Sequence, residues 1–292
     1  IMDPFVDPED VDLEMMRYKP NGWPMIPMFI EAVMRNGRVP EDYDMSHLLA
    51  AGAGCEAVNN NQLDRVQEFL HKHNCNVRFT VGYGSSEGGS NLTFQMAPKS
   101  VHNGNVGIPM PLNDMGVFKP GTQEELGYNE MGEICTVGPG NMLGYDRRSA
   151  TAKTLQRHAD GKIWLHTGDI GYVDEDGVFY VLNRGAAFRY GGGELAVLPM
   201  ENRLADAKIK GIKDEFFVLI EDEDHDGYFV PYLYVVLEDG YKVDDIIKDV
   251  QSCLEPYMFP VEILAIDERP FFHFKTNRIE LSKELKKKNH DC

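Results

Sequence analysis

In the first hundred positions, segments whose apolar residues have strand spacing alternate with segments whose apolar residues have helix spacing. A short apolar run at 46–57 ends in small residues, 59–74 carries apolar residues on one helical face, and 77–84 is a second apolar run. Upstream, 18–37 predicts extended chain entering a helix, with Pro27 in its first turn and a glycine at its end. Strand, helix and strand in this order predict a parallel βαβ unit, and ligands usually bind where such strands end.

The pattern changes near residue 105. The segments 106–118, 132–140 and 177–184 alternate in hydrophobicity between turn residues and predict a compact antiparallel β unit, with a hairpin turn at 174–177. A glycine-dense joint, 185–197, leads into alternating helix and strand patterns that predict a small α+β domain. We therefore expect an α/β protein with one domain over 1–184 and a second over 185–292.

Charge and composition exclude several classes of protein. The 292 residues carry a formal net charge of −18, which argues against nucleic acid as a partner because phosphate binding needs a basic face. No apolar run is long enough to span a bilayer, and the N-terminus has no signal segment. The five cysteines are scattered without zinc-site spacing, which favours a reducing, cytoplasmic setting.

The stretch VGYGSSEGGSNLT, residues 81–93, follows a predicted strand and has three possible interpretations. As a phosphate-binding P-loop it lacks the Gly-Lys-Ser/Thr ending. As the turn of a serine nucleophile it lacks Gly-x-Ser-x-Gly in register, so a serine hydrolase is the weakest hypothesis. Taken alone, the stretch indicates no more than a glycine-rich turn.

Later segments give the stretch a context. Tyr83-Gly84-x-Ser86-Glu87 is followed by GEICTVGPGNMLGY and then by WLHTGD, which ends at Asp169, and by an Asp-Gly pair and Arg184. This ordered set resembles the adenylate-forming superfamily of acyl-CoA synthetases, peptide-synthetase adenylation domains and luciferases. The resemblance covers residues from about 20 to 285.

The resemblance implies a role for each of these residues. The Tyr83 ring would stack on adenine, Ser86 would donate to the α-phosphate, and Glu87 would hold Mg²⁺. Asp169 would accept hydrogen bonds from the ribose hydroxyls, and Arg184 would add donors there. The small residues Gly52, Ala53 and Gly54 stand where the family has the turn that flanks adenine. VGYGSSEGG is then a nucleotide-binding loop, and neither of its serines is a nucleophile.

The implied activity is ATP-dependent activation of a small carboxylic acid as acyl-AMP, followed by transfer to a thiol such as coenzyme A. The family carries a Ser/Thr/Gly-rich lysine loop for the leaving phosphates upstream of the tyrosine motif. Only 82 residues precede Tyr83 and none resembles that loop, so we expect a C-terminal part of the family's enzyme. A missing N-terminal segment or a separate partner would then supply the loop.

The second domain departs from the family pattern at two places. Ala186 and Ala187 stand at the hinge, where the family has Asp or Lys. The late Gly-Lys segment is absent, so Arg278, with Lys275 as a substitute, is the predicted contact to the carboxylate and α-phosphate, although arginine does not replace lysine fully. The glycine run that includes Gly192 and Gly193 would lie against pantetheine, because glycine permits close approach.

Two alternatives to a complete ligase remain open. The chain would be a non-catalytic AMP-binding module if only the adenosine contacts survive. It would be one half of a split ligase if the phosphate loop belongs to another chain. Neither the acid nor the choice between coenzyme A and a carrier-protein thiol follows from the sequence.

Overall fold

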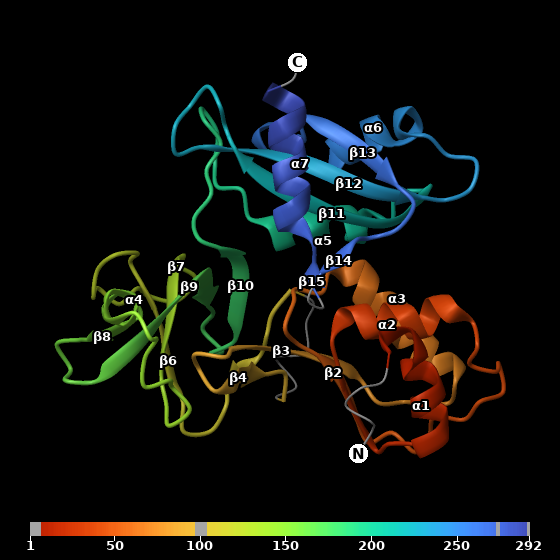
Figure 1. Cartoon of the computed structure of the whole chain (residues 1–292), viewed down its shortest axis with the longest axis horizontal. Helices are drawn as coiled ribbons and strands as arrows, with labels where there is room; N and C mark the ends of the chain where they lie inside the picture. Colours follow the sequence, from red (N-terminus) through yellow and green to blue (C-terminus); the bar gives the residue numbers. More distant parts are fainter. Residues whose placement is uncertain (1–6, 97–103, 273–274, 291–292) are drawn as a thin grey trace. The chain divides into compact units, whose positions relative to one another are not determined.

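The computed structural model describes residues 7–96, 104–272 and 275–290 (Figure 1). The chain divides into two compact units. Unit 1 comprises Ile1–Ala57 and Val66–Gly185, and unit 2 comprises Val58–Arg65 and Ala186–Cys292. The predicted fold class, α/β, is confirmed. The predicted domains, 1–184 and 185–292, stay a prediction.

Unit 1 contains a five-stranded sheet in the order β1-β2-β3-β4-β5. Its first three strands are parallel and the last two pairings are antiparallel. The strands are β1 (Gly22–Met25), β2 (Ala50–Ala53), β3 (Phe79–Ser85), β4 (Ser90–Phe94) and β5 (Ile108–Pro109). Helix α3 (Asn60–Lys72) connects β2 to β3, so the predicted βαβ unit is present.

The second sheet of unit 1 is antiparallel throughout, in the order β10-β9-β7-β6 with β8 also paired to β9. Its strands are β6 (Asp114–Phe118), β7 (Gly132–Val137), β8 (Leu155–Arg157), β9 (Ile163–Val173) and β10 (Phe179–Arg184). Strand β9 is central because it pairs with three others. The predicted hairpin turn at 174–177 joins β9 to β10 and is closed by a hydrogen bond from Gly177 N to Asp174 O.

Three further helices belong to unit 1: α1 (Val11–Tyr18), α2 (Pro27–Asn36) and α4 (Arg148–Thr154). Helix α2 begins at Pro27 and ends at Gly37, whose φ of 61° gives the left-handed stop predicted there. Arg38, one residue further on, donates from Nε to Asp12 Oδ2 on α1 at 2.8 Å, which ties the two helices together. The helix α1 was not predicted.

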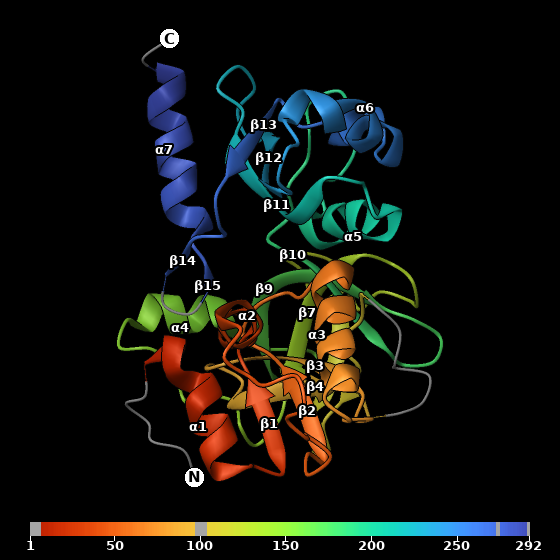
Figure 2. The ribbon, with the colours of Figure 1, turned by 90° about the vertical axis from the view of Figure 1, so that its right-hand side faces the viewer.

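Unit 2 is built on a three-stranded sheet, β11-β12-β13, covered on both faces. Helices α5 and α6 lie on one face and α7 on the other (Figure 2). The elements are α5 (Val197–Ala207), β11 (Ile212–Glu221), β12 (Phe229–Leu237), α6 (Val243–Cys253), η3 (Pro256–Met258), β13 (Glu262–Ile266), β14 (Phe271–Phe272), β15 (Lys275–Thr276) and α7 (Arg278–His290).

Strand alternation divides the apolar residues of unit 2 between two cores. Phe217 and Leu233 face the core that contains α5 and α6. Their neighbours Phe216 and Tyr234 face the core that contains Leu285 of α7. Because both faces are buried, β12 and the segment 216–220 of β11 are nearly continuous apolar runs.

No helix in the described part of the chain is both long and apolar enough to cross a bilayer.

Candidate functional site

The glycine-rich stretch forms the hairpin that joins β3 to β4. Its turn, residues 86–89, is closed by hydrogen bonds from Gly88 N to Ser85 O and from Gly89 N to Ser86 O. A bulge between Tyr83 and Gly84 shifts the register of the two strands. The stretch is therefore a bulged hairpin that projects its side chains beyond the end of a parallel strand.

Gly84 is required by close backbone approach rather than by its own dihedral angles. A Cβ placed on it would lie 1.7 Å from the carbonyl oxygen of Ser90 on the facing strand. No side chain other than hydrogen fits at that distance. The bulge, and with it the direction of the residues that follow, depends on this glycine.

The WLHTGD segment lies within β9. Its last three residues, which we call the Thr167–Gly168–Asp169 turn, lie where the pairing of β9 with β7 is irregular. Gly168 has a φ of +76°, a left-handed conformation that favours glycine. Thr167 donates from Oγ1 to Ile134 O at 2.6 Å and accepts from Asp169 N at 3.1 Å, while Gly185 N donates to Gly168 O at 2.9 Å. These bonds fix the backbone on both sides of Asp169.

The turn brings together three residues that the sequence places far apart. Tyr83 donates its hydroxyl proton to Asp169 Oδ2 at 2.6 Å, and Arg184 Nη1 lies 3.6 Å from Asp169 Oδ1. Asp169 is buried, whereas the Arg184 side chain is 79% exposed. Burial, and then the charge of Asp169, raise the pKa of Tyr83 far above its usual range, so its hydroxyl stays protonated as a donor.

A polar pocket of about 300 Å³ lies beside this turn. It is lined by Ser85, Glu87, Glu133, Tyr145, Lys153, Thr154, Leu165, His166, Thr167, Gly168 and Arg184. Tyr145 donates its hydroxyl proton to Glu87 Oε1 at 2.7 Å, and this bond is the main cause that lowers the pKa of Glu87. The pocket thus presents an ionised carboxylate together with two cationic side chains, Lys153 and Arg184.

The pocket includes Ser85 rather than Ser86. Ser85 belongs to the last position of β3, while Ser86 begins the turn and is exposed. The predicted role of Ser86 at a phosphate stays a prediction. Ser85 is the serine that the described pocket contains.

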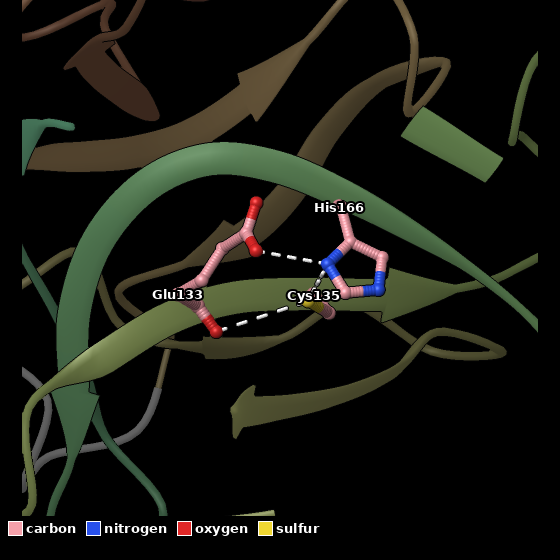
Figure 3. Close-up of side chains that lie close together, drawn as sticks. All are labelled: Glu133, Cys135 and His166. Atoms are coloured by element: carbon pink, nitrogen blue, oxygen red, sulfur yellow. Dashed lines mark hydrogen bonds and ion pairs between the residues drawn. The ribbon is translucent and has the colours of Figure 1, made fainter. Parts of the chain in front are cut away.

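In the wall of the pocket, Glu133 of β7 and His166 of β9 form a close group with Cys135 (Figure 3). His166 Nδ1 lies 2.8 Å from Glu133 Oε2 and 3.4 Å from Cys135 Sγ. Burial acts to raise the pKa of Glu133, but the hydrogen bonds from His166 and from Gly168 N outweigh it and hold that pKa below its usual range. Burial raises the pKa of the Cys135 thiol well above its usual range. The group therefore combines an ionised carboxylate with a protonated thiol.

A family model for AMP-binding enzymes matches residues 1–146, half of the chain. The chain belongs to the AMP-binding enzyme family. The match includes the bulged hairpin with Tyr83 and Glu87, and the family predicted from the motifs is confirmed.

The tobacco relative of this chain is considerably longer than the chain. The 4-coumarate–CoA ligase 2 of Nicotiana tabacum is 29% identical over 245 residues, which cover 82% of this chain and 43% of that protein. The chain thus spans less than half the length of this relative.

Two solved structures show the same fold. MatB from Rhodopseudomonas palustris, solved with ATP bound, matches with a TM-score of 0.80 and 21% identity over 98% of this chain and 55% of that one. The O-succinylbenzoate coenzyme A synthetase MenE from Bacillus subtilis, in complex with ATP and magnesium ion, matches with a TM-score of 0.67 and 21% identity, covering 91% of this chain and 52% of that one.

In this chain the small residues near position 53 have a packing role. A Cβ on Gly52 would lie 2.7 Å from Thr80 O, so this glycine lets β2 approach β3 closely. Ala53 ends β2 and Gly54 follows it, with Gly54 N donating to Met25 O. None of the three lines the described pocket, and their predicted place beside adenine stays a prediction.

The site residues predicted in unit 2 are held by contacts inside that unit. Gly192 and Gly193 pack against Tyr257, whose atoms would lie 2.5 Å and 2.9 Å from a Cβ on each glycine. Arg278 Nη2 lies 3.0 Å from Glu201 Oε1, and Arg278 Nε donates to a backbone carbonyl on β11 at 3.0 Å. Lys275 is exposed on β15.

The hinge alanine Ala187 also has a structural explanation. It is buried in the core of unit 2 and accepts a hydrogen bond from Leu195 N. A charged side chain at that position would be buried in an apolar core whose described residues include none of opposite charge to pair with. Burying an unpaired charge costs free energy of folding.

Among the ionisable pocket residues, sequence reasoning missed four: Glu133, Tyr145, Lys153 and His166. Glu133 and His166 lie inside the segments GEIC and WLHTGD that carried the resemblance. The sequence therefore showed that a glutamate and a histidine lie within these two segments. What the sequence did not show is the pairing of β7 with β9, which puts Cys135 opposite His166 and brings Glu133 to the same place.

Proposed function

We propose that the protein containing this chain is an acid–thiol ligase that activates a carboxylic acid with ATP as acyl-AMP and transfers the acyl group to coenzyme A. The observation that carries the proposal is the meeting of the Tyr83, Asp169 and Arg184 side chains beside a polar pocket that contains Glu87. The similarity to the tobacco relative, a CoA ligase, supports the same reaction class.

The nucleoside would be held by Asp169 and Tyr83. An ionised carboxylate is an acceptor with several lone-pair directions, which suits two adjacent ribose hydroxyls. The Tyr83 hydroxyl donates a hydrogen bond to one carboxylate oxygen of Asp169. The carboxylate that would bind the ribose therefore also holds the Tyr83 ring in place. Arg184, mostly exposed beside Asp169, would add donors to the nucleotide.

The pocket residues fit a magnesium ion carried by ATP. Mg²⁺ prefers oxygen ligands and is commonly bound through one or two carboxylates together with substrate phosphates and water. Glu87 supplies such a carboxylate, and the hydrogen bond from Tyr145 helps to keep it ionised and oriented. When bound, the ion would neutralise charge on the phosphates; Lys153 and Arg184 would contribute positive charge from the same pocket.

In the first half-reaction, an oxygen of the substrate carboxylate attacks the α-phosphorus of ATP, and the bond to pyrophosphate breaks. In the second, a thiol attacks the acyl carbon and AMP leaves. For the unit 2 contact to the reacting groups we favour Lys275 over Arg278, because Arg278 is engaged by Glu201 and by a β11 carbonyl. The glycine loop at Gly192 and Gly193 remains our candidate for the pantetheine contact.

The test is acid-dependent exchange of pyrophosphate into ATP by the full-length gene product, followed by thioester formation with coenzyme A. Glu87→Gln and Asp169→Ala should each reduce exchange strongly, while Glu223→Gln, an exposed acid in unit 2, should not. Exchange without a CoA thioester would indicate a carrier-protein thiol. AMP binding with no exchange across a broad panel of acids would replace the ligase by an AMP-binding module.

A further inference from the structure

We propose that Glu133 and His166 are a positioning pair that sets the Thr167–Gly168–Asp169 turn and thereby the affinity for the nucleotide. The proposal rests on the proposed function, because that function assigns Asp169 to the ribose. It adds two residues to which neither the motifs nor the comparisons give a role.

The carboxylate of Glu133 joins two parts of the site (Figure 3). Its Oε1 accepts from the backbone N–H of Gly168 at 2.9 Å, and its Oε2 lies 2.8 Å from His166 Nδ1. Gly168 immediately precedes Asp169, so one side chain on β7 holds the backbone that presents the ribose carboxylate from β9. A shift of this amide would turn Asp169 away from the Tyr83 hydroxyl.

This contact is distinct from the other bonds that fix the turn. Thr167 Oγ1 and Gly185 N hold the same turn through neutral partners. Glu133 supplies a charged acceptor, and hydrogen bonds to charged groups are stronger than neutral ones. The left-handed φ of Gly168 turns its N–H away from the direction that it would have in a regular strand. The Glu133 carboxylate accepts the hydrogen bond from this N–H.

His166 in turn fixes the carboxylate. With His166 neutral, the Nδ1–H donates to Glu133 Oε2 and Nε2 accepts from His158 Nε2, which lies 2.9 Å away. Burial, and then His166, lower the pKa of His158, which keeps it neutral and able to donate. A histidine held at both ring nitrogens is fixed in orientation, and it therefore helps to fix the carboxylate that it contacts.

The same atoms could instead be the ligands of a metal ion. Glu133, Cys135 and His166 each offer a ligand atom, all within 4.8 Å of one another. The observations favour the hydrogen-bonded pair for two reasons. The carboxylate and imidazole are already in direct contact at 2.8 Å, and the other carboxylate oxygen of Glu133 is occupied by the N–H of Gly168 at 2.9 Å.

The experiment compares Glu133→Ala, Glu133→Gln and His166→Phe in the full-length product, with Cys135→Ser as the variant that separates the two roles. A second control, Phe118→Leu, disturbs the apolar packing beside the cluster without touching the turn. Three readouts are taken: hydrogen–deuterium exchange of the Gly168 amide without nucleotide, the Kd for AMP, and the zinc content of the purified protein.

Glu133→Ala should speed exchange at Gly168 and weaken AMP binding, each by about tenfold, as expected for loss of a charge-assisted hydrogen bond. Glu133→Gln, which keeps an acceptor for Gly168 N, should recover most of both effects. His166→Phe should have an intermediate effect, and Cys135→Ser and Phe118→Leu should change both readouts by less than about twofold. The wild-type protein should contain no stoichiometric zinc.

Unchanged exchange at Gly168 in Glu133→Ala would overturn the proposal, and so would faster exchange with an unchanged Kd. Equal losses in Cys135→Ser and Glu133→Ala, with one zinc per chain in the wild type, would replace it by a metal centre. If the wild type does not bind AMP, the proposed function fails and the nucleotide role of the pair fails with it. The exchange data would then still decide whether Glu133 holds the turn.

Discussion

Replacing Arg278 by alanine separates a structural role for this residue from a catalytic one. Its guanidinium contacts Glu201 Oε1 at 3.0 Å and donates to Phe217 O at 3.0 Å. The Glu201 side chain is 3% exposed and also accepts from Phe217 N at 2.9 Å, while the Arg278 side chain is 29% exposed. The variant would leave a buried carboxylate with one of its two described donors removed. We therefore expect a loss of stability as well as any loss of activity.

The size of this loss follows from the burial of the pair. Removing one partner of a fully buried ion pair costs about 3–5 kcal/mol. Because water reaches part of Arg278, we reduce this to about 2 kcal/mol, which corresponds to a decrease in Tm of roughly 4–8 °C. An exposed pair in the same unit, Arg203 of α5 with Glu255 at 3.6 Å, is the matched control. Arg203→Ala should cost less than about 0.5 kcal/mol.

The assay is a double-mutant cycle in the full-length product, with Arg278→Ala, Glu201→Gln and both together, followed by thermal unfolding. The coupling free energy should exceed about 1 kcal/mol, because the two groups are in contact. Additive effects, or a Tm shift for Arg278→Ala no larger than for Arg203→Ala, would refute the structural reasoning. If stability were unchanged and pyrophosphate exchange abolished, the catalytic role first predicted from the sequence would be restored.

Three further predictions follow from backbone approach, burial and thiol exposure. Gly84→Ala should cost about 1–3 kcal/mol in urea unfolding because its Cβ would overlap a carbonyl oxygen, whereas Gly22→Ala, with open space around it, should be neutral or slightly stabilising. Burial raises the pKa of Glu215 to about 8. The free energy of unfolding should therefore fall as the pH rises from about 4 towards 8, and Glu215→Gln should remove that dependence. Under iodoacetamide, the exposed Cys55 should be alkylated first and the buried Cys135 should stay unmodified in the folded protein; equal rates would contradict the thiol environments.

The parallel βαβ unit was predictable because its pattern is local. The apolar spacing of α3 and the short runs on either side are read within one window of sequence, and Pro27 with Gly37 marks both ends of α2. The helix α1 was missed because the segment before it is acidic and interrupted by proline. Its C-terminal end is marked by the left-handed Lys19, and its N-cap residue Asp10 makes no side-chain capping hydrogen bond.

The site was only partly predictable, because its geometry depends on register and pairing. The motifs identified Tyr83, Glu87, Asp169 and Arg184, and the structure brings the first and the last two together. Strand alternation decides which serine lines the pocket, and the bulge at Gly84 changes that alternation in a way that the sequence does not show. The partnership of Glu133 with His166 depends on β7 lying beside β9, a non-local pairing with no signature in either segment.

The two-faced sheet of unit 2 has a consequence for how the chain can evolve. Phe216 and Phe217 are neighbours in sequence but belong to cores on opposite sides of the sheet. A change in α7 can thus be accommodated at alternate positions of β11 and β12, while the intervening positions stay matched to α5 and α6. In an alignment of relatives, alternate positions of each strand should therefore covary with different helices. One set should covary with α7 and the other with α5 and α6.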